Sequence, residues 1–269
     1  MENAIEVLGK VFTVSLARYV LIAGIPFLFF YSFFSGRLEK SRIQKRLAKK
    51  KDLIREVLHS LSTTIVFTVI AFVILFTPFK QYTLMYDNLH DYPSWYLWVS
   101  LALSLVIHDT YFYWMHRMLH HPKIYRYTHK LHHQSVTPSP WASYSFSILE
   151  AIAEGMVLVV LVFILPMHHL TIILFTVVGL AINVYGHLGY EIAPRSLRNS
   201  WLFEILNTST HHNLHHSRFN GNYGLYFRFW DRVMGTENPD YVKEYDRMQE
   251  KRFGTLKVEK TERGTRGVA

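Results

Sequence analysis

Residues 95–134 read WYLWVSLALSLVIHDTYFYWMHRMLHHPKIYRYTHKLHHQ. The first half, Trp95 to Met115, is an apolar run close to the roughly 20 residues that an α-helix needs to cross the hydrocarbon core of a bilayer. The second half, His116 to Gln134, holds six histidines among nineteen residues. The stretch therefore predicts a membrane-spanning helix that leads directly into a cluster of imidazole groups.

Similar apolar runs occur four more times along the chain. They are Val11 to Phe34, Glu56 to Phe79, Phe146 to Leu165 and His169 to Leu188. The first run is a poor signal peptide, because it lacks a basic start and a small-residue cleavage site. We therefore expect an all-α, multi-pass transmembrane protein with a cytosolic helical cap that carries a histidine-rich site for two metals.

The distribution of charge predicts the topology. The formal net charge is +9, and the densest basic block, Arg37 to Arg55, lies between two apolar runs, as expected of a cytosolic loop rather than of a nucleic-acid site. Residues Lys80 to Ser94 then form a loop on the far side, and the third run returns to the cytosol at His116. A hairpin at Pro166 brings His187 and the downstream cluster HHNLHH to the same side. All the rich histidine clusters are thus expected in one compartment, the cytosol.

Histidines recur at helical spacing in three clusters. Residues three or four positions apart share one face of a helix. The clusters are HRMLH with His116 and His120, HKLHH with His129, His132 and His133, and HHNLHH with His212, His215 and His216. Neutral imidazole binds Fe, Zn, Cu or Ni, and thiolate sites are excluded because the chain has no cysteine. Eight ligands are too many for one tetrahedral zinc, so the clusters predict a two-metal site.

The other histidines receive different predictions. His187, in NVYGHLGY, is predicted to be a ligand because the topology places it beside the clusters, and Asn183, one turn earlier, is a weaker candidate. His108 is offset by about 80° around the helix from His116, so we do not expect it to be a ligand. The remainder are expected to be hydrogen-bonded, interfacial or supporting residues: His59, His90, His121, His168, His169 and His211.

The three clusters, in this order and with a membrane hairpin between the second and the third, resemble the histidine boxes of the sterol desaturase and fatty acid hydroxylase superfamily, membrane-bound diiron enzymes of lipid metabolism. The resemblance runs from about Asp109 to Thr236, and TPSPWASYSF, GHLGYE and NYGLYFRFWDRVMGT are similar to the sterol desaturase branch. It implies three regions: transmembrane helices with the basic loop (1–94), a catalytic domain (95–252) and a polar tail (253–269).

By matching position, the resemblance implies two iron ions and a set of nine ligands: His116, His120, His129, His132, His133, His187, His212, His215 and His216. It implies O2 as co-substrate and Asp109 as a residue that orients a ligand imidazole. The chain departs from the pattern in SFSIL, where Ser147 stands in place of the histidine of an F-H-P motif that many relatives carry. This departure weakens any transfer of substrate from particular relatives.

We therefore expect an O2-dependent hydroxylase or desaturase that acts on an unactivated C–H bond of a sterol or fatty-acyl lipid. The active site would face the cytosol from the endoplasmic reticulum of a eukaryote or from the inner membrane of a bacterium. The histidines cannot decide between an alcohol and an alkene product, because the same ligands serve both outcomes.

The electron donor is expected to be a separate protein. No dinucleotide-binding glycine fingerprint and no haem-attachment cysteine occurs in the sequence. The family resemblance implies a donor of the cytochrome b5 or ferredoxin type. Basic side chains near the second box offer a docking surface, although topology and lipid headgroups are the simpler explanation of their charge: Arg117, Lys123, Arg126 and Lys130.

Two other classes of protein were weighed. A membrane zinc hydrolase needs a general base such as the glutamate of H-E-x-x-H, and that motif is absent from the sequence. A membrane metal-binding or divalent-metal transport protein without oxygenase activity would place its ligands near the middle of the membrane. Here the histidines gather at or beyond the ends of the apolar runs, which favours the enzyme.

Overall fold

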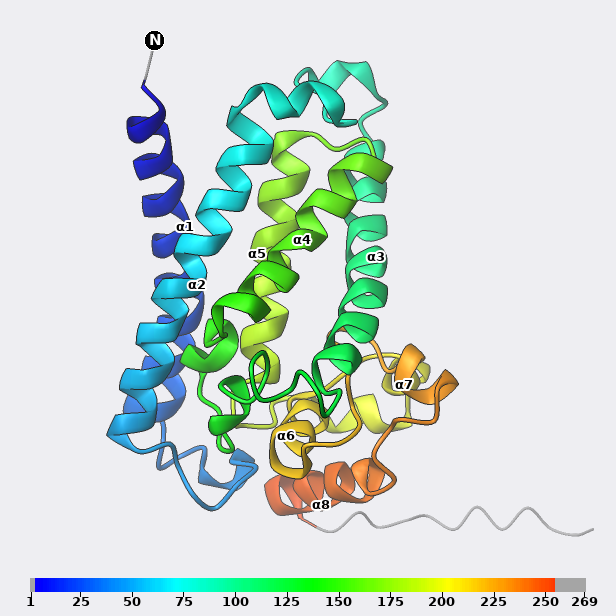
Figure 1. Ribbon diagram of the computed structural model, residues 1–269. Helices are drawn as coiled ribbons and strands as arrows, with labels where there is room; N and C mark the ends of the chain where they lie inside the picture. Colours follow the sequence, from blue (N-terminus) through cyan, green and yellow to red (C-terminus); the bar gives the residue numbers. More distant parts are fainter. Residues whose placement is uncertain (1–2, 255–269) are drawn as a thin grey trace, which may run out of the picture.

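The structure is a computed structural model that describes residues 3–254 (Figure 1). The α-helices are α1 (Ala4–Phe27), α2 (Lys50–Phe76), α3 (Tyr96–Leu119), α4 (Ile148–Ile164), α5 (His169–Gly186), α6 (Ser209–Arg218), α7 (Phe229–Val233) and α8 (Tyr241–Phe253). A π-helical segment, η1 (Leu28–Phe33), continues α1, and short 3-10 helices lie in the connections. Between residues 3 and 254 no β-strand forms, so the expected all-α fold is confirmed.

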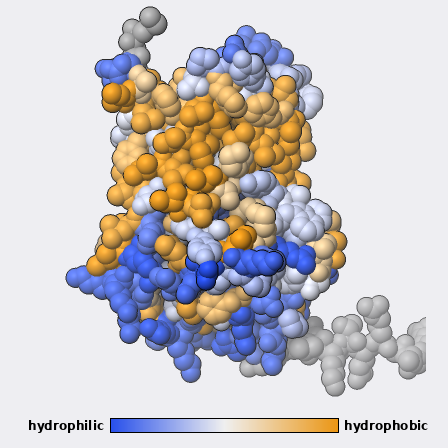
Figure 2. All heavy atoms as spheres, viewed as in Figure 1, coloured by the Kyte–Doolittle hydropathy of each residue, from blue (hydrophilic) through white to orange (hydrophobic). Residues whose placement is uncertain are grey.

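The five long helices coincide with the five apolar runs. Three of them are long and apolar enough to cross a membrane, namely Ala4–Phe33, Lys50–Phe76 and His169–Gly186. Figure 2 shows, on the face in view, an apolar band across the middle of the molecule with polar surface at both ends. The surface therefore matches a protein whose helical bundle lies in a bilayer.

The first two helices begin earlier than their apolar runs because polar caps start them. The side chain of Asn3 accepts a hydrogen bond from the backbone N–H of Glu6 at 2.9 Å. The backbone N–H of Lys49 donates to Asp52 at 3.0 Å, which starts α2 inside the basic loop. Both arrangements satisfy N–H groups that the first turn of a helix leaves without partners.

The basic loop and the histidine segments lie at the same end of the bundle, opposite the N-terminus of α1 (Figure 1). The side-chain amide of Gln44 donates to the carbonyl of Val136 at 2.8 Å and to Oδ1 of Asn213 at 2.9 Å. The backbone N–H of Ile43 donates to the carbonyl of Gly189 at 3.0 Å. The predicted grouping of basic loop and histidines is therefore confirmed, while the assignment of this end to the cytosol stays a prediction.

The core of the bundle lies between α2, α4 and α5. Its buried side chains are Ile74, Val157, Leu161, Val162, Leu165, Met167, Ile172 and Phe175. Helix α1 packs beside α5, where Nη1 of Arg18 donates to Oγ1 of Thr176 at 2.7 Å and the hydroxyl of Tyr19 donates to the carbonyl of Trp141 at 2.8 Å. The first helix is thus tied to the second half of the chain.

The predicted regions are not tested by these contacts. The boundary between 1–94 and 95–252 stays a prediction. The predicted polar tail, 253–269, lies outside the described residues from 255 onward, and its first residue, Phe253, is the last residue of α8.

The topology can be tested by cysteine labelling, because the chain has no cysteine of its own. Lys45 and Ser94 are exposed at opposite ends of the bundle. We expect Lys45→Cys to react with a membrane-impermeant maleimide only from the cytosolic side and Ser94→Cys only from the other side. Labelling of both cysteines from one side would contradict the topology.

Candidate metal centre

The nine histidines that the sequence singled out form two groups. The first group is His116, His120, His129, His133 and His215, and the second is His132, His187, His212 and His216. Within each group, one ring nitrogen of every member lies within 4.8 Å of those of the others. Every member is buried except His120, which is partly exposed. The geometry therefore offers two adjacent centres, each surrounded by imidazole.

The two histidine triplets divide between the groups. In the second box, His129 and His133 belong to the first group and His132 to the second. In the third box, His215 belongs to the first group, while His212 and His216 belong to the second. Each triplet therefore lies between the two centres and serves both.

The spacing of the second box predicted a regular α-helix, but the structure forms none there. Residues 120–131 form turns, and His132–Gln134 form a 3-10 helix. Hydrogen bonds of helical type persist locally, since the backbone N–H of His133 donates to the carbonyl of His129 at 3.2 Å. These turns keep His129 and His133 on one side and direct His132 to the neighbouring group.

Backbone carbonyls fix the outer nitrogen of four rings. Nδ1 of His116 donates to the carbonyl of Tyr223 at 2.9 Å, and Nδ1 of His132 donates to that of Ser145 at 3.3 Å. Nδ1 of His187 donates to the carbonyl of Asn183 at 2.9 Å, and Nδ1 of His215 donates to that of Gly221 at 2.8 Å. A carbonyl oxygen only accepts, so the proton of each neutral ring is on Nδ1. Each Nε2 then carries a lone pair directed toward the interior of its group.

The rings outside the long helices are held neutral. Burial lowers the pKa of the His215 imidazole to about 4. Burial, followed by the neighbouring histidines, lowers the pKa of His132, His212 and His216 well below the usual range. At neutral pH these rings are therefore unprotonated, which is the form that binds a metal.

The lone pairs converge at short range. Nε2 of His187 lies 3.2 Å from Nε2 of His132, 3.1 Å from that of His212 and 3.1 Å from that of His216. The protons of His132 and His187 are on Nδ1, so their facing lone pairs repel each other unless a cation lies between them. Two nitrogens bonded to one metal at about 2.1 Å are about 3.0 Å apart at a right angle and about 3.4 Å apart at the tetrahedral angle. The observed separations are in the range expected of nitrogens that share one metal ion.

Glu150 is the residue of the site that the sequence analysis missed. Its Oε1 lies 2.5 Å from Nδ1 of His129, and both side chains are buried. Such a carboxylate fixes the tautomer of a metal-binding imidazole and raises its basicity. Ser147, at the family's F-H-P position, accepts from the backbone N–H of Glu150 at 3.2 Å and so begins the helix that carries it. The sequence did contain a signal for Glu150, because an acidic residue inside an apolar run is costly and usually functional.

Asp109 reaches the imidazoles through a loop. Its Oδ1 accepts backbone N–H groups from Leu225, Tyr226 and Phe227 at 3.2, 2.7 and 3.2 Å. The same loop contains Tyr223, whose carbonyl accepts from the His116 ring. Asp109 contacts no imidazole directly but holds the backbone that does, and its orienting role stays a prediction.

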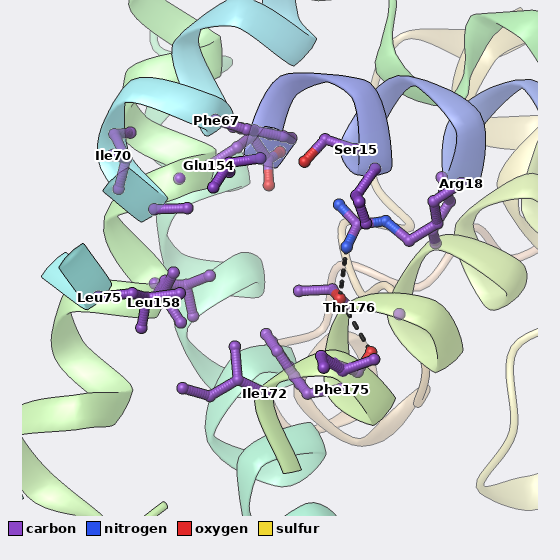
Figure 3. A pocket seen from close by; sticks show the side chains of 18 of the residues that line it. Ser15, Arg18, Phe67, Ile70, Leu75, Glu154, Leu158, Ile172, Phe175 and Thr176 are labelled. Carbon is purple, nitrogen blue, oxygen red and sulfur yellow. Dashed lines mark hydrogen bonds between the residues drawn. The ribbon is translucent and has the colours of Figure 1, made fainter. Parts of the chain in front are cut away.

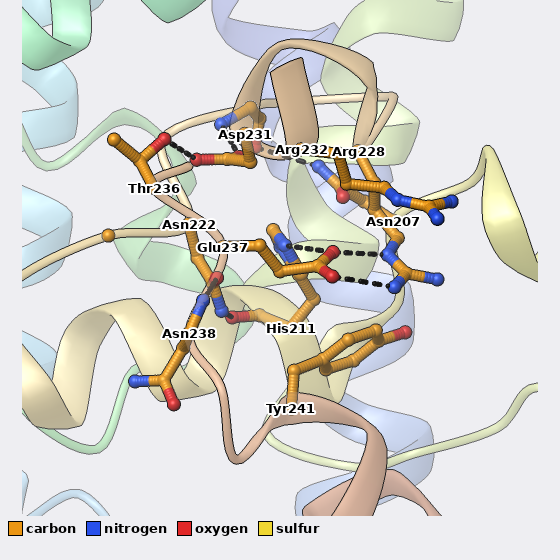
Figure 4. Close-up of polar contacts among 12 residues, drawn as sticks. Asn207, His211, Asn222, Arg228, Asp231, Arg232, Thr236, Glu237, Asn238 and Tyr241 are labelled. Atoms are coloured by element: carbon orange, nitrogen blue, oxygen red, sulfur yellow. Dashed lines mark hydrogen bonds and ion pairs between the residues drawn. The ribbon is translucent and has the colours of Figure 1, made fainter. Parts of the chain in front are cut away.

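A polar network closes the site from the C-terminal side (Figure 4). Asp231 accepts from the backbone N–H of Tyr223 at 2.9 Å and from that of Gly224 at 2.7 Å. Asn222 donates from Nδ2 to the carbonyl of His211 at 2.9 Å, which ties the loop to α6. These contacts fix the loop that supplies carbonyl acceptors to the first group.

The His211 ring itself lies outside both groups, as its spacing predicted. It packs against Tyr241 with a centroid separation of 4.9 Å, and Nε of the buried Arg228 donates to Oε1 of Glu237 at 2.6 Å beside it (Figure 4). Asn183 contributes its carbonyl to His187, and its side-chain amide donates to the carbonyl of Ser143 at 2.8 Å. His108 contacts the hydroxyl of Tyr226 at 2.8 Å.

An apolar cavity of about 560 Å³ adjoins the two histidine groups. It lies between α1, α2, α4 and α5 (Figure 3). Three of its lining residues touch ligand candidates: the ring of Phe112 lies 5.0 Å from that of His116, the ring of Phe146 lies 5.2 Å from that of His132, and Asn183 binds His187. The cavity therefore lies one layer of side chains away from members of both histidine groups.

Comparison with known proteins gives a consistent result. The model of the family described as "Fatty acid hydroxylase" matches residues 101–236. Delta(7)-sterol 5(6)-desaturase ERG3B of Gibberella zeae is 35% identical over 158 residues, which are 58% of this chain and 47% of that protein. Lathosterol oxidase of Mus musculus is 33% identical over 159 residues, or 58% of this chain and 52% of that protein. A probable Delta(7)-sterol 5(6)-desaturase of Neurospora crassa is 27% identical over 229 residues, which are 84% of this chain and 62% of that protein.

The family match covers half of the 269 residues, and the chain belongs to the fatty acid hydroxylase family. Its curated relatives are sterol desaturases and lathosterol oxidases, so the expected resemblance to the sterol desaturase branch is confirmed. The chain spans about half the length of these relatives. No solved structure matches it.

The role of Glu150 can be tested by Glu150→Gln, which preserves shape and removes the charge. We expect metal affinity to fall about 10- to 100-fold, because the amide cannot stabilise the His129 ring as a carboxylate does. Iron content after purification measures the effect. Glu204→Gln changes an acid that is about half exposed and ion-paired with Arg232 at 2.7 Å, and should leave iron content unchanged. Equal iron content in both variants would contradict the assignment.

The loop at Gly224 has no room for a side chain. A Cβ at this position would meet the carbonyl oxygen of Phe227 and would lie 3.1 Å from Oδ2 of Asp231. We expect Gly224→Ala to lower the free energy of unfolding by about 1–3 kcal/mol and to reduce metal content. Thermal unfolding in detergent is the measurement, with Gly9→Ala, where nothing lies within 4 Å, as the control. Equal stability of the two variants would show that the loop is not tightly held.

Proposed function

We propose that the protein is a membrane-bound oxidoreductase that uses O2 and two iron ions to hydroxylate or desaturate a lipid. The observation that carries this proposal is the pair of buried histidine groups at the inner end of an apolar cavity. One centre would be held by the group that contains His116 and the other by the group that contains His187. Family membership supports the same conclusion.

The donor set agrees with iron. The candidate ligands are buried neutral imidazoles, which are suitable ligands for iron, and the sterol desaturase relatives support this choice of metal. When bound, iron in such a site supplies the activation of O2 that oxidation of an unactivated C–H bond requires. The chain supplies the neutral rings, their fixed tautomers and the shelter from water.

The apolar walls of the cavity would exclude water and orient the substrate. The rings of Phe112 and Phe146 line the cavity and contact His116 and His132, so a lipid that fills the cavity would lie against the apolar side of the histidine groups. Removal of water protects a reactive oxidant from side reactions and orients the substrate before the reaction. An alcohol forms if oxygen returns to the carbon, and an alkene forms if a second hydrogen is removed.

The substrate class proposed is a sterol-type or fatty-acyl lipid. The relatives named above carry the names of sterol enzymes, and this supports a sterol before a fatty-acyl chain. The volume of about 560 Å³ and the apolar walls are suitable for a lipid of this size.

Electrons would come from a separate protein of the cytochrome b5 or ferredoxin type, on the cytosolic side. His120 is the only partly exposed member of the two groups. A second cavity of about 490 Å³ lies beside it and is lined by Arg117, His121 and Tyr223 among others. Lys123, Arg126 and Lys130 are exposed nearby, so this face combines the shortest approach to the first group with positive charge suited to an acidic donor.

The alternative of a metal-binding or transport protein is not favoured. A transport site has to release its ion, whereas here the ligands are buried and held by backbone carbonyls. The histidines also lie at one end of the bundle rather than at its middle (Figure 1).

The proposal is tested by His132→Ala and His215→Ala, one from each group. We expect both to lose metal and all lipid oxidation while still entering the membrane, because each removes a buried ligand. Mass spectrometry of lipids from cells supplied with candidate sterols and fatty-acyl lipids measures the product. A gain of one oxygen identifies a hydroxylase, and a loss of two hydrogens identifies a desaturase.

The matched control is His90→Ala, since His90 is exposed and lies outside both groups. It should retain iron and activity. Full activity in both His132→Ala and His215→Ala would refute the site. Unchanged lipids in the presence of bound iron and a competent donor would refute the oxidoreductase function.

A further inference from the structure

A second acid lies on the helix that carries Glu150 and is turned toward the apolar cavity. Glu154 is only 9% exposed and lines the cavity wall (Figure 3). Its carboxyl makes no hydrogen bond and no ion pair with any residue between 3 and 254. A buried carboxyl without a partner is costly, and an acid of this kind inside a membrane bundle usually marks a binding site.

Several polar groups around the cavity are bound to other partners. Arg18 lines the same cavity, but its Nη1 donates to Thr176 at 2.7 Å, and no ion pair links it to Glu154 (Figure 3). Three tyrosines interact with Glu154 electrostatically, namely Tyr111, Tyr144 and Tyr226. The hydroxyl of Tyr111 donates to the carbonyl of Ala153 at 2.7 Å, and that of Tyr226 contacts His108 at 2.8 Å. Neither hydroxyl is hydrogen-bonded to Glu154.

The position of Glu154 relates the cavity to the metal centre. It follows Glu150 by four residues on α4, so the two share a helix face and their Cα atoms are separated by about 6 Å along the helix axis. Glu150 contacts the His129 ring at 2.5 Å. A group bound by Glu154 thus lies about one helical turn from the residues of the first histidine group.

We propose that Glu154 accepts a hydrogen bond from the hydroxyl of a neutral lipid alcohol in this cavity and thereby selects which carbon of the lipid faces the histidines. This proposal rests on the proposed function. A hydroxyl donates to a carboxyl oxygen whether or not the carboxyl is protonated. A lipid acid is disfavoured, because it would place a second carboxyl group beside Glu154.

This mode of binding fixes the orientation of the substrate. The hydroxyl end lies beside Glu154, and the apolar body extends along α1 and α5 toward Val7, Phe76 and His169, which line the other part of the cavity. Oxidation then occurs at carbons near the hydroxyl and not at the far end of the hydrocarbon. A rigid ring alcohol such as a sterol meets this requirement, as does the first part of a long-chain alcohol.

The test is equilibrium binding to the purified full-length protein in phosphatidylcholine nanodiscs. The probes are cholesterol and its methyl ether, which keeps the oxygen but cannot donate, together with oleyl alcohol and oleic acid. We expect wild-type protein to bind each alcohol roughly tenfold or more tightly than its non-donating or acidic counterpart, the effect of one hydrogen bond to a carboxyl group. Glu154→Leu should abolish this preference, and Glu154→Gln should retain part of it, because its amide oxygen still accepts.

Controls separate a binding role from a structural one. Glu154→Leu is expected to unfold at the same temperature as wild type or higher, since it replaces an unpartnered acid with an apolar side chain. Leu158→Ala, which changes an apolar lining residue, should weaken cholesterol and its ether equally. Failure of wild type to bind either alcohol, equal binding of alcohol and ether, tighter binding of oleic acid, or a preference that survives in Glu154→Leu would each overturn the proposal.

The same variants distinguish this inference from the proposed function. His132→Ala should keep the preference for alcohols while losing lipid oxidation. A Glu154-dependent preference in a wild-type protein that oxidises no lipid would refute the function and support the inference. Lipid oxidation without any preference for alcohols would support the function and refute the inference.

Discussion

The structure depends on the convergence of imidazole lone pairs inside a buried site. Nε2 of His132 and Nε2 of His187 are 3.2 Å apart, and both rings hold their proton on Nδ1, where carbonyls accept it. Such an arrangement is repulsive by itself and becomes favourable when a cation accepts both lone pairs. Binding of a metal here would therefore contribute to the folding free energy of this end of the molecule, as it does in other proteins whose ligands are assembled by folding.

The four carbonyls that fix the tautomers come from three separate parts of the chain. Ser145 lies before α4, Asn183 near the end of α5, and Gly221 and Tyr223 in the loop after α6. A further buried polar contact lies in α6, which carries three of the histidines of the two groups. Glu191 is fully buried and accepts from both the backbone N–H and the hydroxyl of Thr210, which secures the start of α6. Polar networks of this kind stabilise one arrangement because leaving any member unpaired is costly.

Much of the architecture was accessible from the sequence, because it depends on local patterns. The length of the apolar runs predicted the five long helices, and the position of the basic block predicted that the histidine segments gather at one end. Spacing identified all eight histidines of the boxes, and topology identified His187. These inferences need only the helical repeat and the cost of burying charge in a bilayer.

The remaining features depend on contacts between distant residues. The division of His132 and His133 between two groups follows from turns that end the helical path after α3, and spacing alone places them on one face. The contact of Glu150 with His129 joins residues 21 positions apart, and the contact of Asp109 with Tyr226 joins residues 117 apart. Such pairs are set by the packing of α3, α4 and the C-terminal loop, which no local pattern encodes.

Helix α4 carries polar residues of the site within an apolar helix of the bundle. It has 17 residues and, like α3, is not among the three helices that are long and apolar enough to span a membrane. Its inward face carries Glu150 and Glu154, both buried, where an ordinary spanning helix would carry apolar side chains. Helix α3 likewise carries Asp109 and His116 on buried positions. The two helices that adjoin the histidines therefore place polar groups of the site on their buried faces, and α3 packs against α4 and α5 at the edge of the bundle (Figure 1).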